Sequence, residues 1–179
     1  MLKDLGATVI DADEAAHAAY EPGSPGFESV VREFGPEYVR DGRIDRARLG
    51  ELVFHDDEAR GRLNAIVHPL VREWVAARTA ESIEAGADVI VQEIPLLFEN
   101  RLEPLYATTV LVYVPEPVQL RRLVEGRGLS ENRALAMIAS QMPIEDKRKL
   151  AAHVVDNSGT PEATRAEVER IWNEALAVR

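Results

Sequence analysis

The 179-residue sequence contains no cysteine. A chain without thiols forms no disulfide, offers no thiolate to a metal ion and has no cysteine nucleophile. Its apolar runs stay well below the roughly 18 residues that cross a membrane, and its N-terminus lacks the pattern of a signal peptide. We therefore expect a cytoplasmic protein with no membrane partner.

Basic residues are also scarce. Lysine and arginine number 21 against 31 acidic residues, which gives a formal net charge of −10. Because nucleic acids bind to basic protein surfaces, we do not expect a nucleic-acid partner. A hydrophobic content of 46% and a length suited to one core favour a single globular domain.

A buried strand is predicted near the middle of the chain, where residues 87–99 read ADVIVQEIPLLFE. The β-branched run is typical of a strand covered on both faces of a parallel sheet, and Pro95 ends it. Glu93 lies near the carboxyl end of this strand, where open α/β sheets bind their ligands. The apolar loop from Leu96 to Glu99 suits a pocket wall. A plain core strand with a proline turn, leaving Glu99 in solvent, explains the pattern equally well.

A second strand is predicted for residues 7–10, and it leads directly into Asp11 and Asp13. Side chains two residues apart on an extended chain point the same way. Such a pair can bind a hydroxyl group, a magnesium-bound water or a phosphoryl group. The alternative is structural, because Asp13 stands directly before a helical pattern and is suited to be its N-cap.

Residues 14–86 follow a helical pattern that is interrupted only by turns such as Asp41-Gly42. A crossover between parallel strands needs only a dozen or so residues, so this length predicts an inserted helical subdomain. His68 and Pro69 lie inside the last of these helices, where proline removes a backbone donor and bends or restarts the helix. A single histidine in such a place is more often structural than catalytic.

Positive charge is concentrated after the next strand, which we predict at residues 109–114. The cations here are Arg121, Arg122, Arg127, Arg133, Lys147, Arg148 and Lys149. Because arginine side chains match phosphate oxygens, the segment is suited to a mobile lid that closes over phosphates. A solvated helix face balanced by nearby glutamates is the structural alternative.

The end of the chain completes the pattern of alternating strands and helices. A last strand is predicted at residues 153–155, and Thr160 and Pro161 are a typical start for the final helix. Regular alternation of this kind predicts an α/β fold with a parallel, three-layer core.

Several short motifs resemble, in order and spacing, those of the dephospho-CoA kinase family. They are Val9-Ile-Asp-Ala-Asp13, Glu21-Pro-Gly23, Val67-His-Pro-Leu70, Ile94-Pro-Leu-Leu-Phe-Glu99, Arg127-Gly-Leu-Ser130, Gln141 and Val155-Asp-Asn-Ser-Gly159. Each motif is weak alone, but together they cover the chain from about Leu5 to its end.

The resemblance implies a P-loop kinase of the nucleoside-monophosphate kinase type, built as one domain over residues 1–179. Its parallel-sheet core would comprise residues 1–13, 87–115 and 151–179, its helical substrate-binding insertion residues 14–86, and its helical lid residues 116–150. The implied reaction is phosphorylation of the ribose 3'-hydroxyl of dephospho-CoA by ATP with Mg²⁺, the last step of coenzyme A biosynthesis. The oligomeric state does not follow from the resemblance.

The resemblance also implies a role for individual residues. Asp13 matches the family's carboxylate beside the acceptor hydroxyl, and Asp11 would support it. Glu93 is a possible ligand of magnesium through water. The acceptor-site wall would be formed by His68, Pro95, Leu96, Leu97 and Glu99, the lid cations would be Arg127 and Arg122, and the loop near adenine would be Asp156, Asn157, Ser158 and Gly159.

Two parts of the family pattern are not matched. The Walker A motif, G-x-x-x-x-G-K-[ST], is absent from the sequence, although in the family it precedes the position of Asp11 by a strand, a loop and most of a helix. Its amides and lysine hold the β- and γ-phosphates. Gly126 and Met137 stand where many relatives carry arginine. We therefore expect little phosphoryl transfer by the chain as written, and a Walker A motif in an upstream extension.

Two other functions also fit parts of the sequence. Asp11 and Asp13 match the nucleophile and the acid/base of haloacid-dehalogenase-like phosphohydrolases, but that function leaves the loop 95–99 and the arginine segment unexplained. A relative that binds coenzyme A or a nucleotide without catalysis is the stronger alternative. It would bind dephospho-CoA and show no ATP turnover.

Overall fold

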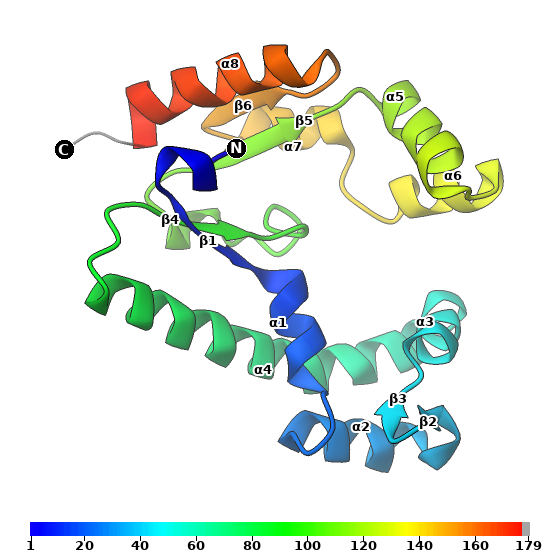
Figure 1. Ribbon diagram of the computed structural model, residues 1–179. Coiled ribbons are helices and arrows are strands. Elements are labelled where there is room, and N and C mark those ends of the chain that lie inside the picture. Colours follow the sequence, from blue (N-terminus) through cyan, green and yellow to red (C-terminus); the bar gives the residue numbers. More distant parts are fainter. Residues whose placement is uncertain (177–179) are drawn as a thin grey trace. The chain divides into compact units, whose positions relative to one another are not determined.

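A computed structural model describes residues 1–176 of the chain. The chain forms two compact units, and each is described by itself. Unit 1 comprises Met1–Ala7 and Pro95–Arg179, and unit 2 comprises Thr8–Ile94. Figure 1 shows the helices and strands of both units along the sequence.

Unit 2 contains a parallel pair of strands, β1 (Thr8–Asp11) and β4 (Ile90–Glu93). Both strands were predicted from their apolar runs, and the structure confirms them. The register pairs Thr8 with Ile90 and Asp11 with Glu93, so that the two carboxyl ends are level. Each strand thus ends in a carboxylate beside that of its neighbour.

The helices of unit 2 begin at short polar side chains that accept hydrogen bonds from free backbone amides. The helix α1 (Ala12–Ala19) begins after Asp11, and α2 (Pro25–Phe34) begins after Ser24, whose hydroxyl accepts from the backbone N–H of Phe27. The helix α3 (Arg46–His55) has Asp45 as its N-cap. A short η2 helix (Pro36–Tyr38) follows α2.

The expectation that residues 14–86 are helical throughout is wrong at one place. A small antiparallel hairpin joins β2 (Val39–Arg40) to β3 (Arg43–Ile44). Asp41 and Gly42 form its turn with φ values of 51° and 75°. Two successive residues with positive φ make the tight turn that suits the twist of paired strands, which explains the Asp-Gly sequence.

The long helix α4 (Asp57–Glu84) runs through Pro69 without a break, so the helix does not restart there. The carboxylate of Asp56 caps it by accepting from the N–H groups of Glu58 and Ala59 at 2.9 Å each. The helices of unit 2 enclose an apolar core whose buried members are Val30, Phe34, Ile44, Leu49 and Ala59.

Unit 1 contains a second parallel pair, β5 (Val110–Tyr113) and β6 (His153–Asp156). Helix α8 (Pro161–Ile171) follows, capped by Thr160 with Pro161 in its first turn, as predicted. Its inner face meets β6 in a core of Val155, Val168 and Ile171. Leu5 of the short η1 helix (Lys3–Leu5) and Leu2, directly before that helix, pack against this core. An η5 segment (Trp172–Leu176) closes the described residues.

The connection between β5 and β6 consists of short helices, as predicted for the lid segment. They are α5 (Glu116–Arg121), the π-helical η4 (Arg122–Gly126), α6 (Glu131–Ala139) and α7 (Ile144–Leu150). A one-turn η3 helix (Glu103–Leu105) precedes β5. None of the helices described in residues 1–176 has the length and apolar character required of a membrane span.

The α/β class with parallel strand pairing is therefore confirmed. The division into core, insertion and lid stays a prediction. In the structure, the helices of residues 14–86 share a compact unit with β1 and β4.

Candidate functional site

The carboxyl ends of β1 and β4 bring two predicted site residues together. Asp11 and Glu93 are register partners on adjacent parallel strands. The side chain of Asp11 is partly buried and that of Glu93 is exposed. In an open α/β sheet this end of the strands is where ligands bind, so the pair lies where the sequence predicts a site.

Asp11 is the N-cap of α1. Its Oδ1 atom accepts a hydrogen bond from the backbone N–H of Asp13 at 2.8 Å. The expectation that Asp13 could be the N-cap is wrong, because the helix begins at Ala12 and the last strand residue supplies the cap. The expectation that both side chains project from one extended strand fails for the same reason.

Asp13 is left free by this arrangement. Its carboxylate is exposed in the first turn of α1, and within residues 1–176 it makes neither a hydrogen bond nor an ion pair. A negatively charged side chain is favoured near a helix N-terminus. A free carboxylate held by a capped helix can accept a hydrogen bond from a substrate hydroxyl.

His68 lies on α4, one residue before Pro69, and its side chain is exposed. No hydrogen bond or ion pair in the described part of the chain joins it to Asp11 or Asp13. Its place in the predicted acceptor site stays a prediction.

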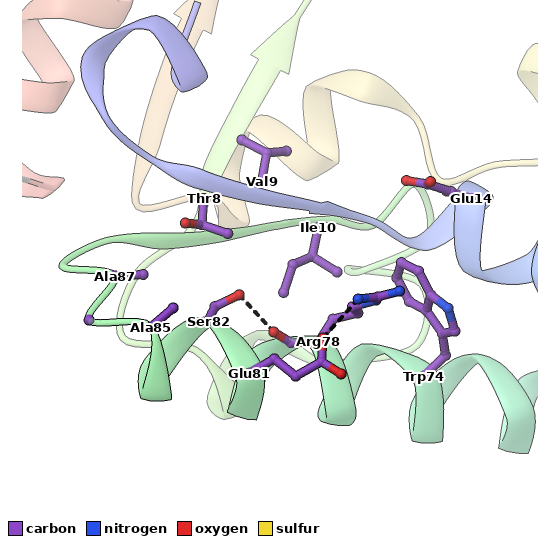
Figure 2. Close-up of a pocket in the computed structure, with 11 residues that line it drawn as sticks. Thr8, Val9, Ile10, Glu14, Trp74, Arg78, Glu81, Ser82, Ala85 and Ala87 are labelled. Atoms are coloured by element: carbon purple, nitrogen blue, oxygen red, sulfur yellow. Dashed lines mark hydrogen bonds and ion pairs between the residues drawn. The ribbon is translucent and has the colours of Figure 1, made fainter.

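Unit 2 also has a groove of about 510 Å³ between β1 and the C-terminal half of α4. Figure 2 shows Trp74 beside the guanidinium of Arg78, which also pairs with Glu81 at 2.8 Å. None of the predicted site residues lines this groove. It therefore adds no residue to the candidate site.

In unit 1, the predicted acceptor loop 95–99 contains a buried charge pair. Oε1 of Glu99 lies 2.7 Å from Nζ of Lys147 and accepts the backbone N–H of Met142 at 2.9 Å. Burial alone would raise the pKa of Glu99, but the hydrogen bonds from Lys147 and the backbone outweigh it and leave the pKa below its usual value. Glu99 is therefore held as a carboxylate.

The apolar members of this loop divide into two sets. Phe98 is buried in a cluster with Leu111 and Tyr113 of β5, and Leu97 packs at its margin. Pro95 is exposed, and Leu96 keeps 40% of its surface accessible. Leu96 is therefore the apolar side chain of the loop best placed to contact a ligand.

The predicted nucleotide loop follows β6 directly. The carboxylate of Asp156 accepts the N–H of Ser158 at 2.8 Å, and hydrogen bonds from Ser158 are the main cause of its lowered pKa. From the lid segment, Arg122 donates to the carbonyl of Asn157 at 2.7 Å. The structure thus joins two predicted groups, the lid cation Arg122 and the loop 156–159.

The remaining lid cations differ in their availability. Arg127 is exposed and forms no hydrogen bond or ion pair within residues 1–176. Three cations of the predicted cluster are engaged with neighbours instead: Lys147 with Glu99, Lys149 with Asp146, and Arg148 with Glu145 and the ring of Tyr113. Arg127 is therefore open to a phosphate, as is Arg121, which is also exposed.

Sequence reasoning missed the role of Lys147. It stands in a row of cations, Lys147-Arg148-Lys149, that reads as a solvated helix end. The one sign that Lys147 differs from its neighbours is its helix face. Lys147 lies three residues after the apolar Ile144, so the two side chains share a face of α7. That signal is weak in a seven-residue helix.

The carboxylates fit the way in which magnesium is bound by kinases. No group of three or more potential metal ligands exists within residues 1–176. Mg²⁺ is usually held by one or two carboxylates together with water and substrate phosphates, and Asp11 and Glu93 offer such oxygens side by side. The residues present therefore fit a magnesium ion that arrives with a nucleotide.

Comparison with known proteins gives consistent results. The family model described as dephospho-CoA kinase matches residues 1–162. A dephospho-CoA kinase of Geobacillus kaustophilus is 44% identical over 97% of this chain and 87% of its own length. One from Carboxydothermus hydrogenoformans is also 44% identical, over 94% of this chain and 82% of its own.

The chain is also similar to solved structures. The crystal structure of TT1252 from Thermus thermophilus aligns with a TM-score of 0.83 at 36% identity, covering 98% of this chain and 88% of that one. The dephospho-CoA kinase from Campylobacter jejuni aligns with a TM-score of 0.68 at 29% identity, covering 97% and 87% of the two chains.

Proposed function

We propose that this chain, which belongs to the dephospho-CoA kinase family, uses Asp13 to direct phosphoryl transfer from ATP to the ribose 3'-hydroxyl of dephospho-CoA. The transfer would complete coenzyme A biosynthesis, and we place it in the cytoplasm. The assignment of Asp13 rests on the different contacts of the two aspartates in unit 2. The side chain of Asp11 caps α1, and the carboxylate of Asp13, two residues later, is left free within the described residues.

The chemistry assigned to Asp13 is general base catalysis. Its carboxylate accepts a hydrogen bond from the 3'-hydroxyl, orients the oxygen towards the γ-phosphorus, and takes the proton as the new O–P bond forms and ADP leaves. Asp11 contributes by fixing the first turn of α1, and so the position of Asp13. With Glu93, it offers oxygens for the Mg²⁺ that accompanies ATP.

The nucleotide would be held by groups of unit 1. The loop 156–159 lies beside Arg122, which keeps that loop in place through the carbonyl of Asn157. Arg127 is an unengaged cation of the lid segment and would neutralise charge on the transferring phosphoryl group. The assignment of adenine as the ligand of the loop 156–159 comes from the family pattern.

The acceptor would be recognised by the helices of residues 14–86 and by the loop 95–99. Leu96 offers an exposed apolar contact for the pantetheine part of dephospho-CoA, and His68 offers an exposed polar group. Glu99 keeps its charge through Lys147. Its role in the acceptor site is to hold the loop in place. The Oε2 atom of Glu99 is buried and accepts no hydrogen bond from residues 1–176.

Phosphoryl transfer also needs a cradle for the β- and γ-phosphates. The Walker A motif that supplies it in P-loop kinases does not occur in the 179 residues. Because positioning and charge neutralisation of the γ-phosphate provide nearly all of the catalysis, we expect turnover only from a form of the protein that carries such a motif.

The test is release of ADP in the presence of dephospho-CoA, with the product analysed for a 3'-phosphate. A form that carries a Walker A loop upstream should turn over, and the 179-residue chain should not. Turnover by the 179 residues alone would contradict the need for the motif. A Walker A form that binds dephospho-CoA but never releases ADP would instead support a binding module without catalysis.

A further inference from the structure

We propose that Lys147 is a positioning residue that fastens the loop 95–99 to helix α7, and that this clip presets the loop for dephospho-CoA. The inference rests on the proposed function for the identity of the ligand. The clip itself rests on contacts within unit 1 and can be tested separately.

The burial of Lys147 is the first observation. It is 5% exposed, and it is the only charged residue among residues 1–176 that is buried to this degree. A lysine can normally extend its four-carbon stem until the ammonium reaches water. Burying an ammonium is costly unless it is paired and hydrogen-bonded, so its partners must hold it in place.

The partners of Lys147 are the second observation. Its Nζ atom lies 2.7 Å from Oε1 of Glu99, 3.2 Å from Oε1 of Gln141 and 3.3 Å from the carbonyl oxygen of Pro95. An ammonium has three N–H donors, and here each has an acceptor. Pro95 and Glu99 are the first and last residues of the loop, so one side chain holds both of its ends.

Further contacts connect the same two segments. The N–H of Met142 donates to Glu99 at 2.9 Å, and Phe98 is buried in the cluster against which Met142 and Ile144 pack. Polar and apolar contacts of the loop thus both reach residues 141–147, in addition to the packing of Phe98 on β5. Leu96 is left out of these contacts and remains 40% exposed.

This arrangement has a consequence for substrate binding. A loop that is ordered before the ligand arrives does not lose conformational entropy on binding. Loss of the clip should therefore weaken dephospho-CoA binding, by on the order of tenfold if one or two loop residues must then be ordered by the ligand. ATP binding should change little, because the clip contacts neither Arg122 nor the loop 156–159.

The experiment compares Lys147→Met with Lys149→Met in the 179-residue protein. Lys149 lies on the same helix but pairs with Asp146 at the surface, so it controls for loss of a lysine. Hydrogen exchange is followed by mass spectrometry for amides 96–102, with α8 reporting global stability. The affinities for dephospho-CoA and for ATP are measured by calorimetry.

For Lys147→Met, we expect exchange of amides 96–102 to quicken by about tenfold or more and to stay faster than exchange in α8, because the loop then opens locally without global unfolding. Dephospho-CoA binding should weaken and ATP binding should persist. Lys149→Met should match the wild type. In the double variant Lys147→Met/Glu99→Gln, exchange should recover in part, since no unpaired carboxylate remains buried.

If amides 96–102 exchange at the wild-type rate in Lys147→Met, Lys147 does not fasten the loop and the proposal is wrong. Faster exchange with unchanged dephospho-CoA affinity would overturn its role in substrate binding. If Lys147→Met does not fold, Glu99→Gln gives the same test, with a smaller acceleration expected because the amide still accepts from Lys147. A wild-type protein that ignores dephospho-CoA would contradict the proposed function and leave the clip to be judged by exchange alone.

Discussion

Asp13 and Glu99 are both carboxylates that follow a parallel strand along the chain, yet their surroundings are opposite. Asp13 is exposed and free of partners in the described residues, whereas Glu99 is mostly buried and bound by Lys147 and a backbone amide. A free carboxylate can exchange a proton with a substrate. A carboxylate fixed by an ion pair instead keeps its loop in position. We propose a catalytic role for Asp13 in unit 2 and a positioning role for Glu99 in unit 1.

The strongest way to break this comparison is to neutralise Asp13. In a form of the protein that carries a Walker A loop, Asp13→Asn should lower kcat by about 10² to 10⁴-fold, which is typical of losing a general base. Dephospho-CoA affinity should change little. Steady-state kinetics measure the effect. A wild-type kcat in Asp13→Asn would show that the residue is not the base.

The counterpart for unit 1 is a loss of stability. Lys147→Met leaves Glu99 in its mostly buried place without a cation, which typically costs about 3 to 5 kcal/mol of unfolding free energy. Lys149→Met, whose pair with Asp146 is exposed, should cost under about 1 kcal/mol. Urea unfolding monitored by circular dichroism compares them. Equal losses in both variants would contradict the buried role of Lys147.

A smaller effect separates Asp11 from Asp13. Asp11→Ala removes the N-cap of α1 and should cost about 1 kcal/mol of stability, whereas Asp13→Ala removes no described contact and should cost almost none. Asp11→Asn should retain the cap, because asparagine accepts the same hydrogen bond. Thermal unfolding of the three variants checks the order. A larger loss in Asp13→Ala than in Asp11→Ala would reverse the assignment of the cap.

The smallest effect is a pH dependence. The pKa of Glu99 lies below its usual value of about 4.5 in the folded protein. A carboxylate with a lowered folded pKa stabilises the protein above its unfolded pKa, and this contribution disappears as the pH falls through the folded pKa. The stability difference between wild type and Glu99→Gln should therefore be constant from neutral pH to about pH 5 and shrink in more acidic solution. A difference that grows on acidification would have the wrong sign.

Local sequence patterns predicted much of the fold. The β-branched run before Pro95 and the capping pair Thr160 and Pro161 each specify their element from neighbouring residues, and the structure confirms them. The hairpin at residues 39–44 was missed because strands of two residues show no periodicity. Its Asp-Gly turn was the one signal available.

The site was harder to predict where it depends on contacts between distant segments. Asp11 and Asp13 were proposed as site residues because both stand at one strand end in the sequence. Lys147 was not assigned a role, because its partners Glu99 and Pro95 are far away in sequence. A row of cations looks the same whether one member is buried or not. The choice of Asp11 as the cap depends on where the strand stops, and element boundaries are poorly specified by propensity.

The most direct test of the central claim is calorimetric titration of dephospho-CoA and, separately, of ATP into the purified 179-residue protein, with circular dichroism melting as the control for folding. The claim that residues 14–86 and 95–99 form the acceptor side predicts a cooperatively melting protein with saturable binding of dephospho-CoA. A protein that melts cooperatively and binds ATP well, yet shows no heat of binding with dephospho-CoA, would contradict the assignment of the two sides.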